Sequence, residues 1–114
     1  MRSFYSLRIQ AYRIFDIDKI NNILDIVPTK SDENYWELEK ILDEESEYYD
    51  YINYFLDILE GKYQELEQIG IEKSNISIWL IYEYDQQCNM EFSPSQMKRL
   101  GENDITFCIS CLQK

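Results

Sequence analysis

The chain has 114 residues, the size of a single domain, and carries a net charge of −11. It contains no histidine, which excludes Ser-His-Asp and Cys-His nucleophiles and His-ligated zinc sites. Aromatic side chains make up 15% of the residues, and this argues against disorder despite the high charge. We therefore expect one folded domain spanning residues 1–114.

The sequence predicts a cytoplasmic protein that does not enter a membrane. No apolar run approaches the ~20 residues that a membrane-spanning helix needs. Residues 1–8 are interrupted by charge too early to form the apolar region of a secretory signal. The three cysteines form no even set, which agrees with a reducing compartment.

The first third of the chain predicts a strand, a helix and a loop. Residues 3–12 alternate in polarity, as a half-buried strand does. Asp16 is a suitable N-cap for a helix that buries a stripe of aliphatic residues and stops at Pro28. The expected stripe is Ile20, Ile23, Leu24 and Val27. Residues 30–34 are expected to form a polar loop.

The middle of the chain predicts a strand followed by the longest helix. Residues 35–42 carry both strand and helix signals, and we favour a strand because the capping residue Asp43 follows directly. From about 44 to 68 a buried helical stripe recurs. Its members are Tyr49, Ile52, Leu56, Leu59, Tyr63 and Leu66. Gly61 marks a kink or an early end, and Gly70 is a natural terminator.

The last third predicts three strands and a short helix. Residues 75–84 alternate but carry large apolar groups on both faces, which indicates an interior strand. A turn at 85–87 leads into a short strand at 88–92. Ser93, Pro94 and Gln96 form a capping-box signature for a helix that buries Met97 and Leu100 and ends at Gly101. Residues 104–112 alternate as a final strand.

These elements predict an α+β two-layer domain. The expected order is strand, helix, strand, helix, strand, strand, helix, strand, with about five strands in one mainly antiparallel or mixed sheet. Two long helices and one short helix would pack against that sheet.

Three short motifs carry a resemblance to a known family. They are residues 24–29 (Leu-Asp-Ile-Val-Pro-Thr), Trp36, and residues 92–101 (Phe-Ser-Pro-Ser-Gln-Met-Lys-Arg-Leu-Gly) leading into the final strand. With them the chain resembles the bacterial domain-of-unknown-function family number 4279, although Asp25 stands where that family usually has a C-cap glycine. The resemblance implies a small cytoplasmic α/β domain and supplies no catalytic residues. Some small domains of this type accompany polymorphic toxins as immunity proteins, and the resemblance implies that role here.

The negative charge is concentrated in one segment. Residues 32–67 contain thirteen acidic residues and two lysines, so this segment carries the whole net charge of −11 and the remainder is neutral. Nucleic acids and anionic membranes are poor partners, because both need a density of Lys and Arg. A basic protein would be steered toward such a surface. The alternative is a solvated helix face that only keeps the protein soluble.

Four residues at the start of the long helix are the candidate partner-binding site: Glu47, Asp50, Tyr51 and Tyr54. If Tyr49 turns inward, Tyr51 and Tyr54 share a more exposed side beside the two carboxylates. Tyrosine is enriched at binding hot spots, and a neighbouring carboxylate can pair with a partner's Arg or Lys. Alternatively, these rings cover the edge of the core. As an exposed site, these positions should tolerate substitution without loss of stability.

No cofactor, metal site or catalytic residue is predicted. Cys108 and Cys111 form a C-x-x-C spacing, but in a strand residues three apart point to opposite faces, so we expect three ordinary thiols with no metal. There is no glycine-rich phosphate loop and no serine elbow. We expect a non-enzymatic acidic protein-binding domain, an immunity- or antitoxin-like inhibitor of a basic toxin. The alternative is a structural or self-assembling domain with no inhibitory role.

Overall fold

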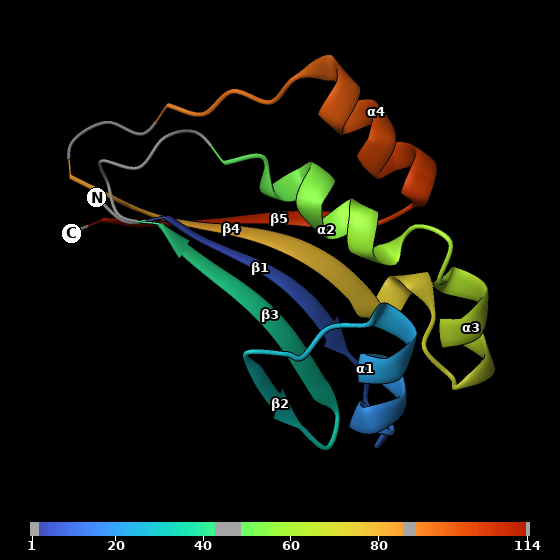
Figure 1. The fold of residues 1–114 in the computed structure, drawn as a ribbon. Helices are drawn as coiled ribbons and strands as arrows, with labels where there is room; N and C mark the ends of the chain where they lie inside the picture. The colour runs from blue at the N-terminus through green and yellow to red at the C-terminus, as the bar shows by residue number, and fades with distance from the viewer. Residues whose placement is uncertain (1–2, 43–48, 86–88, 114) are drawn as a thin grey trace.

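The protein is an α+β two-layer fold built on one mixed five-stranded sheet (Figure 1). The computed structural model describes residues 3–42, 49–85 and 89–113. The strands are β1 (Ser3–Gln10), β2 (Lys30–Asp32), β3 (Tyr35–Leu42), β4 (Ile76–Tyr84) and β5 (Thr106–Gln113), arranged in the order β2-β3-β1-β4-β5. The helices are α1 (Ile17–Leu24), α2 (Tyr51–Leu59), α3 (Tyr63–Gln68) and α4 (Pro94–Asn103), with a 3₁₀ turn η1 (Lys73–Asn75). The predicted fold class is confirmed.

The sheet register places the buried apolar residues of β1, β3 and β4 on one face. Strand β1 lies in the middle and pairs antiparallel with β3 and β4, so that Leu7 stands opposite Leu38 on one side and Ile78 on the other. Strand β4 pairs in parallel with β5, which brings Phe107 beside Ile78. Because side chains alternate along each strand, this register gathers one apolar face across four strands.

Helices α1, α2 and α4 pack against that apolar face (Figure 1). The fully buried large side chains come from both layers and form one core cluster. They are Trp36, Phe55, Leu7, Ile9, Ile20, Ile52, Leu56, Leu59, Leu66, Ile71, Ile76 and Ile78. On the α1 side, the buried Trp36 indole donates its N–H to Asn21 Oδ1 at 2.8 Å, so the ring's polar atom is satisfied.

Helix α1 begins where predicted and ends earlier. The carboxylate of Asp16 caps it by accepting the Lys19 backbone N–H, and Ile20 and Leu24 are buried. The helix ends because Asp25 adopts a left-handed conformation, with φ at 56°. The chain therefore turns before Pro28, and the expected burial of Val27 is wrong, since its side chain is 76% exposed.

The long helix expected over about 44–68 is two shorter helices. Helix α2 begins after its N-cap Asp50, and the proposed cap Asp43 lies outside the described residues. Gly61 separates α2 from α3 with φ at 83°, a conformation that other residues adopt only at a cost. Gly70 then ends the segment after α3 with φ at 88°, as expected for a terminator.

Helix α4 shows the predicted capping box and a different buried face. Ser93 accepts the Gln96 backbone N–H at 3.1 Å, and the Gln96 side chain accepts the Ser93 N–H at 3.2 Å. The expected burial of Met97 is wrong, and Gln96 is buried instead. The helix also runs past Gly101 to Asn103, because Asp104 supplies the left-handed cap.

Two strand predictions also differ from the structure. The short strand expected at 88–92 is not present over residues 89–92, and residue 88 lies outside the described residues. The expected polar loop at 30–34 contains the three-residue strand β2, which pairs with the first residues of β3. A turn at 33–34 connects the two strands, so a short hairpin forms despite the polar sequence.

The second face of the sheet carries a compact polar cluster. Glu37 is buried there and accepts the Tyr35 hydroxyl at 2.7 Å. The Arg8 guanidinium lies 3.7 Å from Glu37 and 4.4 Å above the Trp79 ring. The pKa of Tyr35 is raised, mainly by burial and to a smaller extent by the hydrogen bond to Glu37. These contacts give β4 the partial cover on its second face that its sequence predicts.

Candidate functional site

The predicted partner-binding residues fall around the N-terminus of α2, where the structure gives them different roles. Glu47 lies outside the described residues. Asp50 is the N-cap of α2 and accepts the Asn53 backbone N–H at 3.2 Å and the Asn53 side-chain amide at 2.6 Å. It also accepts the Gln96 amide at 2.8 Å, so this carboxylate joins α2 to α4.

The expectation that Tyr51 is exposed is wrong. Its side chain is 5% exposed and belongs to the core cluster. The ring stacks on Tyr5 of β1 at a centroid distance of 4.2 Å and lies 6.3 Å from Phe107 of β5. These contacts show that the first residue of α2 faces the sheet. A partner cannot use this ring as an anchor while α2 stays packed.

Tyr54 is half-buried at the border of the core. Its ring lies 5.9 Å from that of Tyr49 and 5.5 Å from that of Phe55. The Lys40 ammonium group lies 5.6 Å from the ring centroid. Tyr54 therefore remains accessible in part, but two aromatic rings and a lysine lie beside it.

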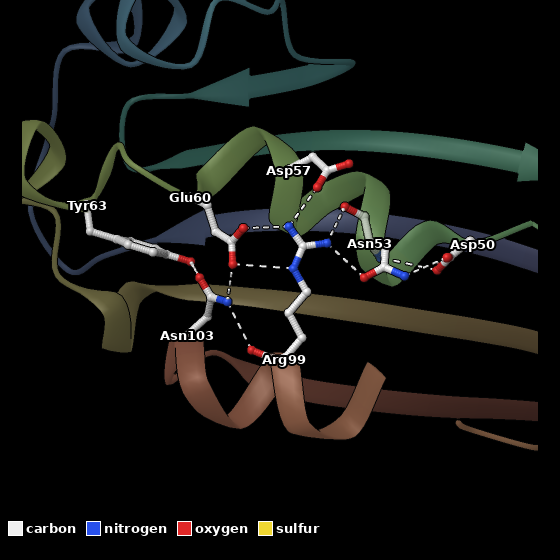
Figure 2. A network of polar contacts seen from close by, with 7 residues as sticks. All are labelled: Asp50, Asn53, Asp57, Glu60, Tyr63, Arg99 and Asn103. Atoms are coloured by element: carbon white, nitrogen blue, oxygen red, sulfur yellow. Dashed lines mark hydrogen bonds and ion pairs between the residues drawn. The ribbon is translucent and has the colours of Figure 1, made fainter. Parts of the chain in front are cut away.

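Arg99 of α4 is the centre of the polar network at this side of the molecule (Figure 2). Its guanidinium donates to Asp57 Oδ1 at 2.6 Å, to Glu60 Oε1 at 2.6 Å and to Asn53 Oδ1 at 2.8 Å. The Arg99 side chain is 24% exposed. One cation thus links three positions along α2 to α4, with the planar geometry that suits arginine.

Asn103 extends the same network to α3 (Figure 2). Its amide nitrogen donates to Glu60 Oε2 at 2.8 Å, and its oxygen accepts the Tyr63 hydroxyl at 2.7 Å. Burial, followed by the nearby Glu60 charge, raises the pKa of Tyr63 to about 12, so this phenol stays a donor at neutral pH. The network therefore fixes α2, α3 and α4 relative to one another.

The network shifts the acidity of two carboxyl groups. Hydrogen bonds from Arg99, then from Asn103, lower the pKa of Glu60 from 4.5 to about 2. For Asp50, partial burial is the largest influence and raises the pKa, but the bonds from Asn53 and Gln96 together outweigh it and leave the pKa lowered. Both groups are therefore anionic at any physiological pH.

We expect the pKa of Glu60 to rise from about 2 toward 4.5 when Arg99 is replaced by methionine, since Arg99 is its main hydrogen-bond donor. An NMR pH titration of the Glu60 carboxyl group measures this. Lys98→Met is the matched control, because Lys98 is exposed on the same helix and lies 3.8 Å from the exposed Glu102. A Glu60 pKa that stays near 2 in Arg99→Met would contradict the assigned network.

The lowered pKa also predicts how stability depends on pH. A carboxyl group with a depressed folded-state pKa stabilises the fold above its unfolded value and loses that contribution as the pH falls through its folded value. For Glu60 this window runs from about 4.5 down to about 2. The same decline should be weaker in Arg99→Met, as unfolding in urea at a series of pH values can show.

Replacing Asp50 with alanine should lower the free energy of unfolding by about 1 kcal/mol, because an N-cap acceptor is lost. The bond to Gln96 is lost as well. Asp50→Asn keeps a capping oxygen and should cost less, as chemical denaturation of both variants will show. This reverses the expectation that Asp50 tolerates substitution, and equal stability of Asp50→Ala and the original protein would contradict it.

A groove of about 810 Å³ lies beside this network, between the N-terminal ends of α2 and α4. Asp50, Asn53 and residues 91–96 line it. Its charged lining groups among the described residues are the carboxylates of Asp50 and Glu91, and hydroxyl groups of Ser93 and Ser95 stand nearby. The groove therefore suits a cationic side chain better than an anion.

Sequence reasoning assigned no site role to Arg99 or Asn103, and it placed Gln96 in the capping box without its bond to Asp50. The capping box correctly predicted the start of α4. The carboxylates that Arg99 binds are on another segment, so they depend on how α2 and α4 pack. One signal was available: among residues 94–103, Arg99 lies one helical turn before Asn103, so both share a face.

The two cysteines within the described residues, Cys108 and Cys111, are free thiols on β5. Cys108 stands opposite Trp79 and Cys111 opposite Tyr82, so the two point to opposite faces of the sheet, as predicted. No disulfide joins them, and Cys88 lies outside the described residues. In the part of the chain that the structure describes, no three Cys, Asp or Glu residues are grouped closely enough to hold a metal ion. That the thiols bind no metal stays a prediction.

Comparison of the chain with models of protein families, with curated proteins and with solved structures finds no significant match. The resemblance to the family number 4279 therefore stays a prediction. None of the helices within the described ranges has the length and apolar character needed to cross a membrane.

Proposed function

We propose that this chain is a non-catalytic protein-binding domain whose partner is a basic protein, and that it acts as an immunity- or antitoxin-like inhibitor of a basic toxin. The observation that carries the proposal is the location of the charge. All of the net charge of −11 belongs to residues 32–67, and α2 and all but the last residue of α3 lie in that segment. The resemblance to the uncharacterised family number 4279 agrees with this, since some small domains of this type accompany polymorphic toxins as immunity proteins.

The exposed carboxylates of α2 and α3 support an electrostatic docking surface. Four acidic side chains of these helices are exposed: Asp57, Glu60, Glu65 and Glu67. We call them the acidic helical side. Arg99 offsets the charge of only the first two, through the network in Figure 2. A surface with one sign of charge speeds encounter with an oppositely charged partner and disfavours like-charged ones.

The groove beside Asp50 supplies a place for a specific contact. Its carboxylates can receive a lysine or arginine of the partner, while the ring of Tyr54 stays partly accessible at the border of the core. Tyr51, by contrast, is buried and packs α2 against the sheet. The proposed docking residues are therefore Asp50, Tyr54 and Glu91 together with the acidic helical side.

The test uses the purified products of the reading frames adjacent to the gene. A toxin among them should arrest growth when expressed alone, and co-expression of this chain should restore growth. The purified pair should associate more slowly as salt rises, because screening weakens steering beyond ~10 Å at 0.1 M. Binding that strengthens with salt, or no binding to any adjacent product, would count against the proposal.

Glu67→Lys should slow that association several-fold at low salt, and the effect should vanish at high salt. Lysine near the C-terminal end of α3 suits the helix dipole, so a slower association would not reflect unfolding. Asp85→Lys is the matched control, because Asp85 is exposed after β4 and outside the acidic segment. Stopped-flow kinetics compare the two variants. An equal effect of both substitutions would place the docking surface elsewhere.

A further inference from the structure

The two edges of the sheet are protected to different degrees. Strand β2 forms one edge with three residues and carries Lys30 and Asp32. Strand β5 forms the other edge with eight residues, and none of them is charged or is a proline. Short edge strands with charged side chains resist pairing with other chains, whereas long uncharged edges invite it. Only the β2 edge has the usual protection.

The outer edge of β5 is also accessible. It is the last strand in the sheet order, and β4 is its neighbouring strand within the described ranges. Ile109 is 44% exposed and Leu112 is 50% exposed. An edge strand presents a row of backbone N–H and C=O groups that another extended strand can satisfy. Accessible apolar side chains on both faces add to the contact that such pairing offers.

We propose that β5 pairs antiparallel with β5 of a second copy of the chain, forming a symmetric dimer with one continuous sheet. The two-fold axis would stand perpendicular to the sheet, so the helices of both copies would cover the same face. This inference goes beyond the proposed function and does not depend on it.

Charge favours a second copy over another partner at this edge. A basic protein is drawn to carboxylates, and β5 has none. Two copies of β5 meet without like charges facing each other, although each chain carries −11 overall. The dimer should therefore strengthen as salt screens the repulsion between the two chains. This salt dependence is opposite to the one expected for a basic partner.

Symmetry restricts the register. Residues directly opposite each other in an antiparallel pair point to the same face, so the two-fold axis must pass through a residue position rather than between two. The largest overlap of the two copies of β5 places Ile109 opposite Ile109 or Ser110 opposite Ser110. In the first register Phe107 faces Cys111, and in the second Ile109 faces Cys111.

Sedimentation equilibrium under reducing conditions tests the dimer over a range of protein concentrations, at ~0.1 M and ~1 M salt. We expect a monomer–dimer equilibrium that shifts toward dimer at the higher salt. Ile109→Lys places an ammonium group of each copy inside the paired region and should weaken dimerisation about tenfold or more. Ile14→Lys changes the net charge equally at an exposed position outside the strands, and it should dimerise as the original protein does.

Disulfide cross-linking gives an independent test that does not depend on destabilising the edge. With the three natural cysteines replaced by serine, Ile109→Cys or Ser110→Cys should form a covalent dimer, depending on the register. Diamide serves as the oxidant and takes up the two electrons and two protons that the two thiols release. Val27→Cys is the control for random collision, since Val27 is exposed far from β5 in the sequence.

Three results would overturn the proposal. The first is a protein that stays monomeric at all concentrations and both salts. The second is a dimer that Ile109→Lys and Ile14→Lys affect equally. The third is cross-linking of Ile109→Cys and Ser110→Cys at the rate of Val27→Cys.

Discussion

Replacing Tyr51 with alanine should lower the free energy of unfolding by about 3–5 kcal/mol, the range for removing a large buried aromatic ring. The ring is packed between α2 and the sheet, where it stacks on Tyr5 and approaches Phe107. Alanine would leave a cavity between α2 and the sheet, next to Tyr5 and Phe107, and such a cavity adds to the free-energy cost. Unfolding in urea, followed by circular dichroism, measures the loss.

Two variants separate this role from that of a surface residue. Tyr51→Phe keeps the ring and should cost much less than Tyr51→Ala. Tyr54→Ala removes a half-buried ring at the core border and should also cost clearly less. If Tyr51→Ala were as stable as Tyr54→Ala, the inward position of the first residue of α2 would be wrong.

Leu59→Ala should cost about 2–5 kcal/mol of stability, as expected for a leucine removed from a packed core. Leu59 is fully buried in the last turn of α2 and belongs to the core cluster. The loss combines the transfer free energy of the side chain with the cavity that remains. Thermal and chemical unfolding of the variant should both show it.

Val27→Ala is the matched control, because it removes an aliphatic side chain that is largely exposed. We expect its effect to stay within about 0.5 kcal/mol. A comparable loss in the two variants would mean that Val27 is buried after all, as its helical spacing predicted.

Several local features were predictable because a few neighbouring residues determine them. The Ser93 capping box and the Asp16 cap each depend on hydrogen bonds that span three residues, and both form as predicted. The strands β1 and β4 follow from alternation along short segments, and so does the burial of Leu7, Ile9 and Ile78. The strand β3 was ambiguous by its own pattern, and the choice of a strand depended on the cap expected at Asp43. In each case the signal and the structure lie within the same few residues.

The candidate site was harder to predict. Helical spacing shows which residues share a face, but it does not show where the helix begins. The spacing of Ile52, Leu56 and Leu59 correctly predicts one buried face of α2. Whether Tyr51 lies inside or outside depends on where the helix begins and which face meets the sheet. Asp50 starts the helix, and the contact with Tyr5 of β1 decides the orientation.

By itself, the sequence determined the α+β class, most strand and helix positions, and the concentration of negative charge in residues 32–67. These properties depend on composition, on periodicity and on caps a few residues long. The tertiary structure alone decided that Tyr51 is buried, that Arg99 joins α2 to α4, and that β5 forms an unprotected edge. Each of these depends on contacts between segments far apart in the chain, such as the bond from Arg99 to Asp57, and local patterns do not encode such contacts.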